Sequence, residues 1–266
     1  MRNFLVLLVA LLIYTTSSAQ AVKPLPNAHA HNDYRHKRPL LDALENGFTS
    51  IEVDIHLVDG ELYVAHDKPA SKNPNKTLRA MYLDPLVDIV SKNNGKVYPG
   101  YEGDFYLMID FKTNGSATYS VLKEQLETCK EILTSYNGDK VTKRAVTIFI
   151  SGSRPFDEVL KENNKLVAVD GRPTDLGKGY SAAFMPVVSD SYKNHFGWKG
   201  NGEMTDEEKD HLEEMVYLVH QEGKKLRLWA SPENLEVWKV LKAAGVDFIN
   251  TDKLEELKAF LVMDKK

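Results

Sequence analysis

Residues 50–67 read SIEVDIHLVDGELYVAHD, and this stretch shows which fold the chain adopts. From Ser50 to Val58 apolar and polar residues alternate, which is the period of a β-strand. Asp59-Gly60 is typical of a tight hairpin turn, so ELYVAHD is expected to run back along the strand as an extension of it. The stretch therefore predicts a strand whose polar side chains share one face.

Six further runs rich in Val, Ile and Phe, and the short run NAHAH, predict strands, and segments with helical spacing of apolar residues separate most of them. With SIEVDIHLV, the predicted strands are NAHAH, FYLMIDF, AVTIFIS, KLVAVD, FMPVVSD, KLRLWAS and VDFINTD. The predicted helices are PLLDALENG, TLRAMYLDPLVDIVSK, SVLKEQLETCKEILTSY, DEEKDHLEEMVYLVHQEG and NLEVWKVLKAAG. Glycines 47, 223 and 245 stand where helices commonly end.

Eight strands in alternation with helices favour a closed (β/α)₈ TIM barrel of the α/β class over an open sheet. The chain has 266 residues, 42% of them hydrophobic, and no linker or low-complexity tract divides it. We expect a single domain over residues 24–263. In such a barrel the active site forms at the carboxyl ends of the strands.

The first twenty residues predict a secretory signal peptide: Arg2 is followed by the apolar run FLVLLVALLIY and then by small residues. We therefore expect an exported protein, periplasmic or extracellular, with no transmembrane segment in the mature chain. Cys129 is the only cysteine, which excludes an intramolecular disulfide. The net charge is −4 and the basic residues are scattered, so a nucleic-acid partner is not expected.

Three carboxylates predict a metal site. Period-two spacing puts Glu52 and Asp54 on one strand face, and Asp110 ends the uncharged run of the next strand. Carboxylates sharing a face inside a barrel repel one another unless a cation binds them, and oxygen ligands favour Mg²⁺ or Ca²⁺. The alternative is a half-exposed edge strand with its polar residues outward.

Histidines accompany the carboxylates at the predicted strand ends. His29 and His31 lie two residues apart in His29-Ala-His31-Asn32-Asp33, so both would face one site. His66 follows the hairpin, and His56 shares the face of the carboxylates. Lys112 shares the face of Asp110, where it would meet an anionic oxygen; the alternative is an ordinary Asp–Lys surface pair.

Taken together, these groups resemble the glycerophosphodiester phosphodiesterases and the wider superfamily of phosphatidylinositol-phospholipase-C-like barrels. The family pattern corresponds here to His31, Glu52-Val-Asp54, His66-Asp67 and Asp110-Phe-Lys112. LRLWAS and AAGVDFINTD are similar to the family's last two strands, with Trp229 and Asp252 in matching places. The resemblance spans residues 28 to 257.

The resemblance implies hydrolysis of a small-molecule or lipid phosphodiester with one divalent cation, held by Glu52, Asp54 and Asp110. His31 and His66 would act as acid and base. The substrate-binding residues implied or suggested beside them are Asn32, Lys112, His29, His56 and Trp229; plain barrel packing is the alternative for Trp229.

The chain departs from the family at two places. The usual His-Arg-Gly reads His31-Asn32-Asp33, and the glutamate of the Pro-Glu-Asn segment is absent, since Leu40 and Leu41 follow Pro39. These departures indicate an atypical branch, similar in this respect to spider-venom sphingomyelinases D. Two rivals remain: a His-x-His metal-dependent hydrolase of the amidohydrolase or histidinol-phosphatase-like barrels, and a non-catalytic barrel that binds a phosphate ligand.

Overall fold

The structure is a computed structural model that describes residues 22–138 and 140–263. The predicted signal peptide lies outside the described residues. Within them, no helix is both long enough and apolar enough to cross a bilayer.

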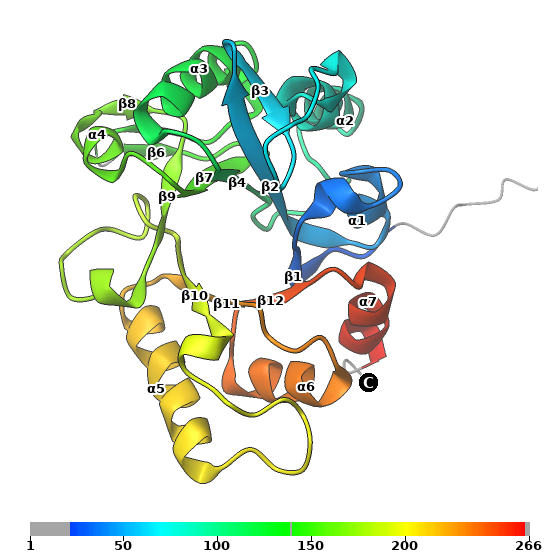
Figure 1. Cartoon of the computed structure of the whole chain (residues 1–266), viewed down its shortest axis with the longest axis vertical. Coiled ribbons are helices and arrows are strands. Elements are labelled where there is room, and N and C mark those ends of the chain that lie inside the picture. The colour runs from blue at the N-terminus through cyan, green and yellow to red at the C-terminus, as the bar shows by residue number, and fades with distance from the viewer. Residues whose placement is uncertain (1–21, 139, 264–266) are drawn as a thin grey trace, which may run out of the picture.

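Eight parallel strands close into a barrel, as predicted (Figure 1). β2 pairs with β1 on one side and with β4 on the other, so it is not an edge strand. The order around the barrel, with β1 also pairing with β2, is β1 (Leu25–Ala30), β12 (Phe248–Thr251), β11 (Lys225–Trp229), β10 (Val187–Ser191), β9 (Ala168–Gly171), β7 (Thr147–Gly152), β4 (Tyr106–Phe111) and β2 (Phe48–Val58).

Helices surround the barrel at most of the crossings from one strand to the next (Figure 1). They are α1 (Leu41–Glu45), α2 (Asp84–Lys92), α3 (Gly115–Glu127), α4 (Phe156–Lys161), α5 (Asp206–Gln221), α6 (Leu235–Ala244) and α7 (Leu254–Met263). Gly245 caps α6, and Gly47 and Gly223 follow the last residues of α1 and α5 by two positions; all three have positive φ.

The alternation of strand and helix is interrupted between β9 and β10, where no helix was predicted. That connection contains a short 3₁₀ turn, Pro173–Asp175, and no α-helix. The predicted helix over 120–136 is too long at its end: α3 stops at Glu127, and β5 (Ser135–Asn137) begins a small sheet with β6 (Lys140–Thr142) and β8 (Asn164–Lys165). α4 and α7 were not predicted.

The predicted hairpin is present. β3 (Glu61–Val64) runs antiparallel to β2 outside the barrel, and both turn residues, Asp59 and Gly60, have positive φ. This is the turn geometry that suits the twist of two antiparallel strands. The hairpin brings the chain back to the carboxyl end of β2, where His66 follows.

Two cores hold the barrel. The larger lies between strands and helices and takes the outward residues of β2, namely Ile51, Val53 and Ile55. The smaller fills the base of the barrel interior with apolar and aromatic side chains that include Tyr106, Phe149 and Phe248. Above this apolar base the interior is polar, because the inward positions near the strand ends carry Glu, Asp, Ser, His and Arg.

Candidate active site

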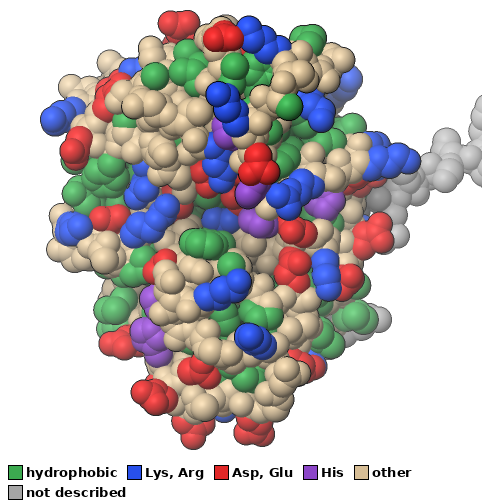
Figure 2. Space-filling view, in the orientation of Figure 1, with side chains coloured by type: hydrophobic (Ala, Val, Ile, Leu, Met, Phe, Trp, Pro, Cys, Tyr) green, Lys and Arg blue, Asp and Glu red, His purple; other side chains and the backbone are tan. Residues whose placement is uncertain are grey.

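A cavity of about 260 Å³ opens at the carboxyl ends of the barrel strands. Figure 2 shows acidic, basic and histidine side chains gathered around a hollow on this face. The residues that line it are His31, Asn32, Glu52, His66, Met108, Asp110, Lys112, Ser151, Gly152, Asp170, Arg172, Arg227 and Trp229. The sequence-predicted site residues His31, Asn32, Glu52, His66, Asp110, Lys112 and Trp229 are thus brought to one place.

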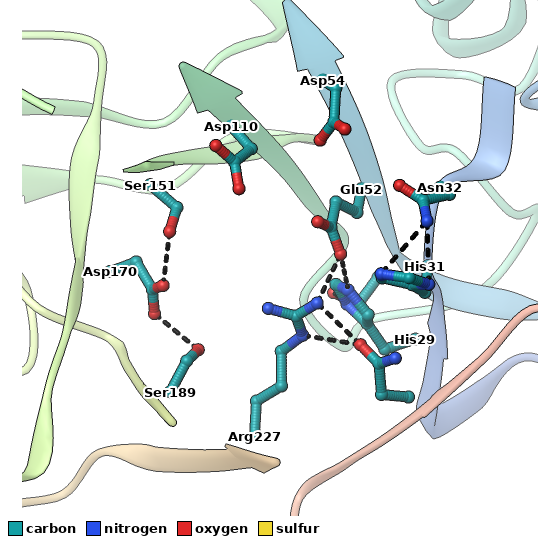
Figure 3. Close-up of polar contacts among 12 residues, drawn as sticks. His29, His31, Asn32, Glu52, Asp54, Asp110, Ser151, Asp170, Ser189 and Arg227 are labelled. Atoms are coloured by element: carbon teal, nitrogen blue, oxygen red, sulfur yellow. Dashed lines mark hydrogen bonds and ion pairs between the residues drawn. The ribbon is translucent and has the colours of Figure 1, made fainter. Parts of the chain in front are cut away.

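The three predicted metal ligands lie together (Figure 3). Asp54 and Asp110 are neighbours in the register of β2 and β4, and Glu52 lies one pleat below Asp54 on the same face. One carboxylate oxygen from each of Glu52, Asp54 and Asp110 lies within 4.8 Å of those of the other two. Among the described residues, this is the only group of three acidic, histidine or cysteine side chains so arranged.

Each carboxylate is anchored through one of its oxygens. Glu52 Oε2 accepts from Arg227 Nη2 and lies 3.2 Å from His29 Nε2. Asp54 Oδ2 accepts from the Tyr34 hydroxyl at 2.8 Å and is 3.2 Å from Lys112 Nζ. Asp110 Oδ2 is 3.4 Å from the same ammonium group. These contacts hold the three carboxylates in place beside one another.

The remaining oxygens of the two aspartates are buried without a hydrogen-bond partner. Asp54 Oδ1 and Asp110 Oδ1 are both in this condition among the described residues. Leaving such an atom unpaired costs about 1–3 kcal/mol, and more when the group is charged. Hard oxygen donors, each held in place and short of a partner, fit a hard divalent cation.

The pKa values of the three carboxylates also indicate that the cluster is suited to a cation. Burial, and then the neighbouring carboxylates against the opposing effect of Lys112, raises the pKa of Asp110 to about 6. Burial and Glu52 likewise raise the pKa of Asp54. Burial also opposes ionisation of Glu52, but Arg227 and His29 hold its pKa well below the usual value. Holding three negative charges here is therefore unfavourable, and a bound cation would favour the ionised form of both aspartates.

His31 belongs to a pair that spans the barrel closure. Its Nδ1 lies 2.7 Å from Asp252 Oδ1, just beyond β12, which leaves Nε2 as the nitrogen not engaged by that carboxylate. Burial lowers the pKa of His31, but the hydrogen bond to Asp252 and the charge of Glu52 outweigh burial and raise it. The side-chain amide of Asn32 lies 3.1–3.2 Å from both ring nitrogens (Figure 3).

The other predicted histidines have different positions. His29 is fully buried between Ser50 and Glu52, where burial and Arg227 lower its pKa to about 3, so it supports Glu52 and does not line the cavity. His56 is also buried, and its Nε2 lies 3.2 Å from the backbone carbonyl of His66, so it positions that loop. His66 itself is half exposed at the cavity rim beside Asp67.

Several residues of the site were missed by reasoning from the sequence. Arg227 is buried in β11 and reaches Glu52 and Asn250, and Tyr34 holds Asp54. Asp170 lies opposite, where it accepts from Ser151 at 2.7 Å and Ser189 at 2.6 Å (Figure 3). Arg227 and Asp170 occupy inward positions of predicted strands, and that period-two placement was the available signal.

The two histidines of the His-x-His motif do not converge on one point. His29 directs Nε2 towards Glu52, whereas His31 directs Nδ1 towards Asp252. The group that fits a metal among the described residues contains no histidine. This geometry argues against the rival hydrolase in which both histidines bind zinc.

Comparison with known proteins identifies relatives along most of the chain. A family model described as the AIM6-like phosphodiesterase domain matches residues 16–168. The altered inheritance of mitochondria protein 6 homolog of Arthroderma benhamiae is 25% identical over 276 residues, covering 93% of this chain and 87% of that protein. Altered inheritance of mitochondria protein 6 of Eremothecium gossypii is 29% identical, covering 90% and 70%.

The protein of the same name from Saccharomyces cerevisiae strain YJM789 is 25% identical over 273 residues, covering 88% of this chain and 70% of its own length. The matched family model includes β1, β2 and β4, and therefore all three clustered carboxylates. Because that model extends over more than half of the sequence, the chain belongs to the AIM6-like phosphodiesterase domain family.

Proposed function

We propose that this chain hydrolyses a phosphodiester, either a glycerophosphodiester or a phospholipid headgroup ester, with one divalent cation, Mg²⁺ or Ca²⁺. The proposal treats the chain as an atypical branch of the glycerophosphodiester phosphodiesterases, without the Pro-Glu-Asn glutamate, that is exported through its N-terminal signal peptide. The observation that carries it is the convergence of three anchored carboxylates beside the His31–Asp252 pair.

Glu52, Asp54 and Asp110 would hold the cation, each through one carboxylate oxygen. A bound cation neutralises charge on the non-bridging phosphate oxygens and makes phosphorus easier to attack. Lys112, at 3.2 Å and 3.4 Å from two of the carboxylates, lines the cavity as well, so its ammonium group also faces the phosphate. Asn32 lines the same wall as a neutral donor.

Proton transfer falls to the two histidines that line the cavity. Asp252 fixes the His31 ring through Nδ1, so His31 exchanges its proton with the substrate at Nε2. His66 at the rim is the second group, and one of the two takes a proton from the attacking hydroxyl while the other protonates the leaving oxygen. Each such transfer contributes on the order of 10²–10⁴ in rate.

The test is turnover of bis(p-nitrophenyl) phosphate by the purified mature chain after chelation and after addition of Mg²⁺, Ca²⁺ or Zn²⁺. We expect activity with Mg²⁺ or Ca²⁺ that falls at least about 100-fold in His31→Ala and in Glu52→Ala. His220→Ala is the matched control, because His220 pairs with Asp247 away from the cavity. Folding of each variant is checked by circular dichroism.

Two outcomes would refute the proposal. Zinc-dependent activity that needs His29 would restore the His-x-His hydrolase, and tight phosphate-ester binding without turnover would indicate a non-catalytic binder. Full activity in both folded variants would show that the site is assigned wrongly. A screen of glycerophosphodiesters, lysophospholipids and inositol phospholipids then identifies the substrate.

A further inference from the structure

The cavity wall opposite the carboxylates is built around an arginine. Arg172 follows β9 directly, and its Nη1 donates to Asp170 Oδ2 at 2.7 Å and to the Gly171 carbonyl at 2.7 Å. Asp170 is 1% exposed, and hydroxyl groups from β7 and β10 already hold both of its oxygens. The Arg172 side chain keeps 32% of its surface exposed and lines the cavity. Arg172 Nη2 also donates to Ser151 Oγ at 3.3 Å, so Asp170 and Ser151 together fix an arginine that stays partly open to the cavity.

A second arginine lies behind this wall. Arg154 follows β7 by two residues, and its Nε is buried without a hydrogen-bond partner among the described residues. Burial, and then the charge of Arg172, lowers the pKa of Arg154. Asp170 and Asp175 raise that pKa in turn, so carboxylates already act on Arg154, and its Nε is the donor that they leave without a hydrogen bond.

The remainder of the cavity is not suited to a cationic headgroup. Lys112, Arg172 and Arg227 bring positive charge to its lining, each paired there with one of the acids Asp110, Asp170 and Glu52. Trp229 is the single aromatic side chain among the described residues that line it, whereas recognition of a quaternary ammonium group typically uses a cage of several aromatic rings. A choline or ethanolamine group in this space would meet like charge.

We propose that the wall formed by Arg172, with Arg154 behind it, is a second anion subsite, so that the alcohol released from the diester carries a phosphomonoester of its own. This inference rests on the proposed diester hydrolysis and adds its substrate class. The planar guanidinium presents paired N–H donors that match phosphate oxygens, and two arginines suit a group with up to two negative charges. The scissile phosphate would lie by the carboxylates and the monoester across the cavity from it.

A purely structural role for Arg172 is the alternative. Neutralising buried Asp170 would require one ion pair, which Nη1 already makes. It would leave unexplained why the guanidinium stays open to the cavity and why the buried Nε of Arg154 has no hydrogen-bond partner in the described structure.

The test compares kcat/KM for glycerophosphoinositol 4-phosphate, glycerophosphoinositol and glycerophosphocholine in the mature protein with its metal. We expect the phosphorylated headgroup to be preferred over choline by at least about tenfold. In Arg172→Gln the phosphorylated substrate should lose roughly 10- to 100-fold more than the other two, because only it loses a charged contact. Arg172→Lys, which keeps the charge, should restore part of the preference.

Arg144→Gln is the matched control, since Arg144 lies 3.9 Å from Glu131 and lines no part of this cavity. Its preference among the three substrates should equal that of the wild type. Equal losses for all three substrates in Arg172→Gln, or a wild-type preference for choline, would overturn the anion subsite while leaving diester hydrolysis intact. Absence of turnover on every diester, bis(p-nitrophenyl) phosphate included, would overturn the proposed function and this inference with it.

Discussion

At the scale of single residues, the site is organised by what holds each charged group. Arg227 and His29 take one oxygen of Glu52, and Tyr34 and Lys112 take one oxygen of Asp54. These contacts remove rotational freedom from the carboxylates before any ligand arrives. Preorganisation of this kind lowers the cost of binding, because the ordering is already complete in the folded protein.

The His31–Asp252 pair gives a prediction about pH. In Asp252→Asn we expect the pKa of His31 to fall, since burial then acts without the opposing carboxylate contact. A histidine whose pKa is raised in the folded state stabilises the protein below its unfolded pKa of about 6.5 and loses that contribution as the pH rises through the folded value. The variant should therefore lose more stability at pH 5.5 than at pH 9.

Measurement of this effect uses NMR titration of the His31 ring together with urea unfolding at the two pH values. Asp247→Asn is a useful comparison, because Asp247 pairs with His220 at 2.8 Å away from the cavity and should leave the His31 titration unchanged. An unaltered His31 titration in Asp252→Asn would contradict the pairing.

Arg227 gives a second prediction at this scale. It is the buried partner of a buried carboxylate, and removing one member of such a pair leaves an uncompensated charge. We expect Arg227→Ala to destabilise the metal-free protein by about 3–5 kcal/mol. The exposed Arg144→Ala should change stability by less than about 0.5 kcal/mol, as measured by urea unfolding. Similar small changes in both variants would mean that Glu52 does not depend on Arg227.

At the scale of elements, the end of β7 determines whether Asp110 fits. Gly152 has φ +66°, and a Cβ atom there would lie 2.0 Å from Asp110 Oδ1. Gly60 in the β2–β3 turn has φ +82° with nothing within 4 Å of such an atom. The two glycines share a backbone requirement, but only Gly152 makes a close approach to the proposed metal site.

Alanine at these two glycines separates strain from site geometry. Both variants should lose about 1 kcal/mol from the positive φ. We expect Gly152→Ala also to lower metal-dependent turnover at least about tenfold, because Asp110 must move, while Gly60→Ala keeps wild-type turnover. Unfolding and turnover are measured for both variants. Equal turnover in the two variants would contradict the prediction that a side chain at position 152 displaces Asp110.

The strands of the barrel were more predictable from the sequence than the ends of its helices. All eight barrel strands were predicted, since every strand except β1 is a short run rich in β-branched or aromatic residues and set off by turns or helices. The helix over 120–136 was extended past Glu127 because Ile132, Leu133 and Tyr136 continue the apolar spacing, although they belong to a 3₁₀ turn and a strand. Local periodicity does not show where tertiary pairing ends a helix.

At the scale of the whole molecule, the cation should contribute to stability. Because the three carboxylates repel one another without it, saturating Mg²⁺ or Ca²⁺ at 100 times its dissociation constant should add about 2.7 kcal/mol to the free energy of unfolding. Differential scanning calorimetry would detect this as a higher Tm. Asp110→Asn should abolish the shift, whereas Asp88→Asn, on α2 away from the cavity, should retain it.

The clustering of the site residues was predictable only in part. Glu52, Asp54 and Asp110 lie on adjacent strands early in the chain, so strand periodicity alone brings them together. Arg227 is 175 residues from Glu52 and Asp252 is 221 residues from His31, so their contacts depend on how the barrel closes. The family resemblance pointed to Asp252, but the sequence did not predict that Asp252 pairs with His31. The roles assigned to these residues remain predictions.

Closure between β1 and β12 has a consequence for synthesis. Strands β2 and β4 could pair before the C-terminal third of the chain has been synthesised, but His31 meets Asp252 only after nearly the whole polypeptide has emerged. Contacts of such long sequence separation form late and slowly. The three carboxylates would therefore come together before Arg227 can pair with Glu52. During that interval the cluster lacks this positive partner and should bind cations from the surrounding solution most readily.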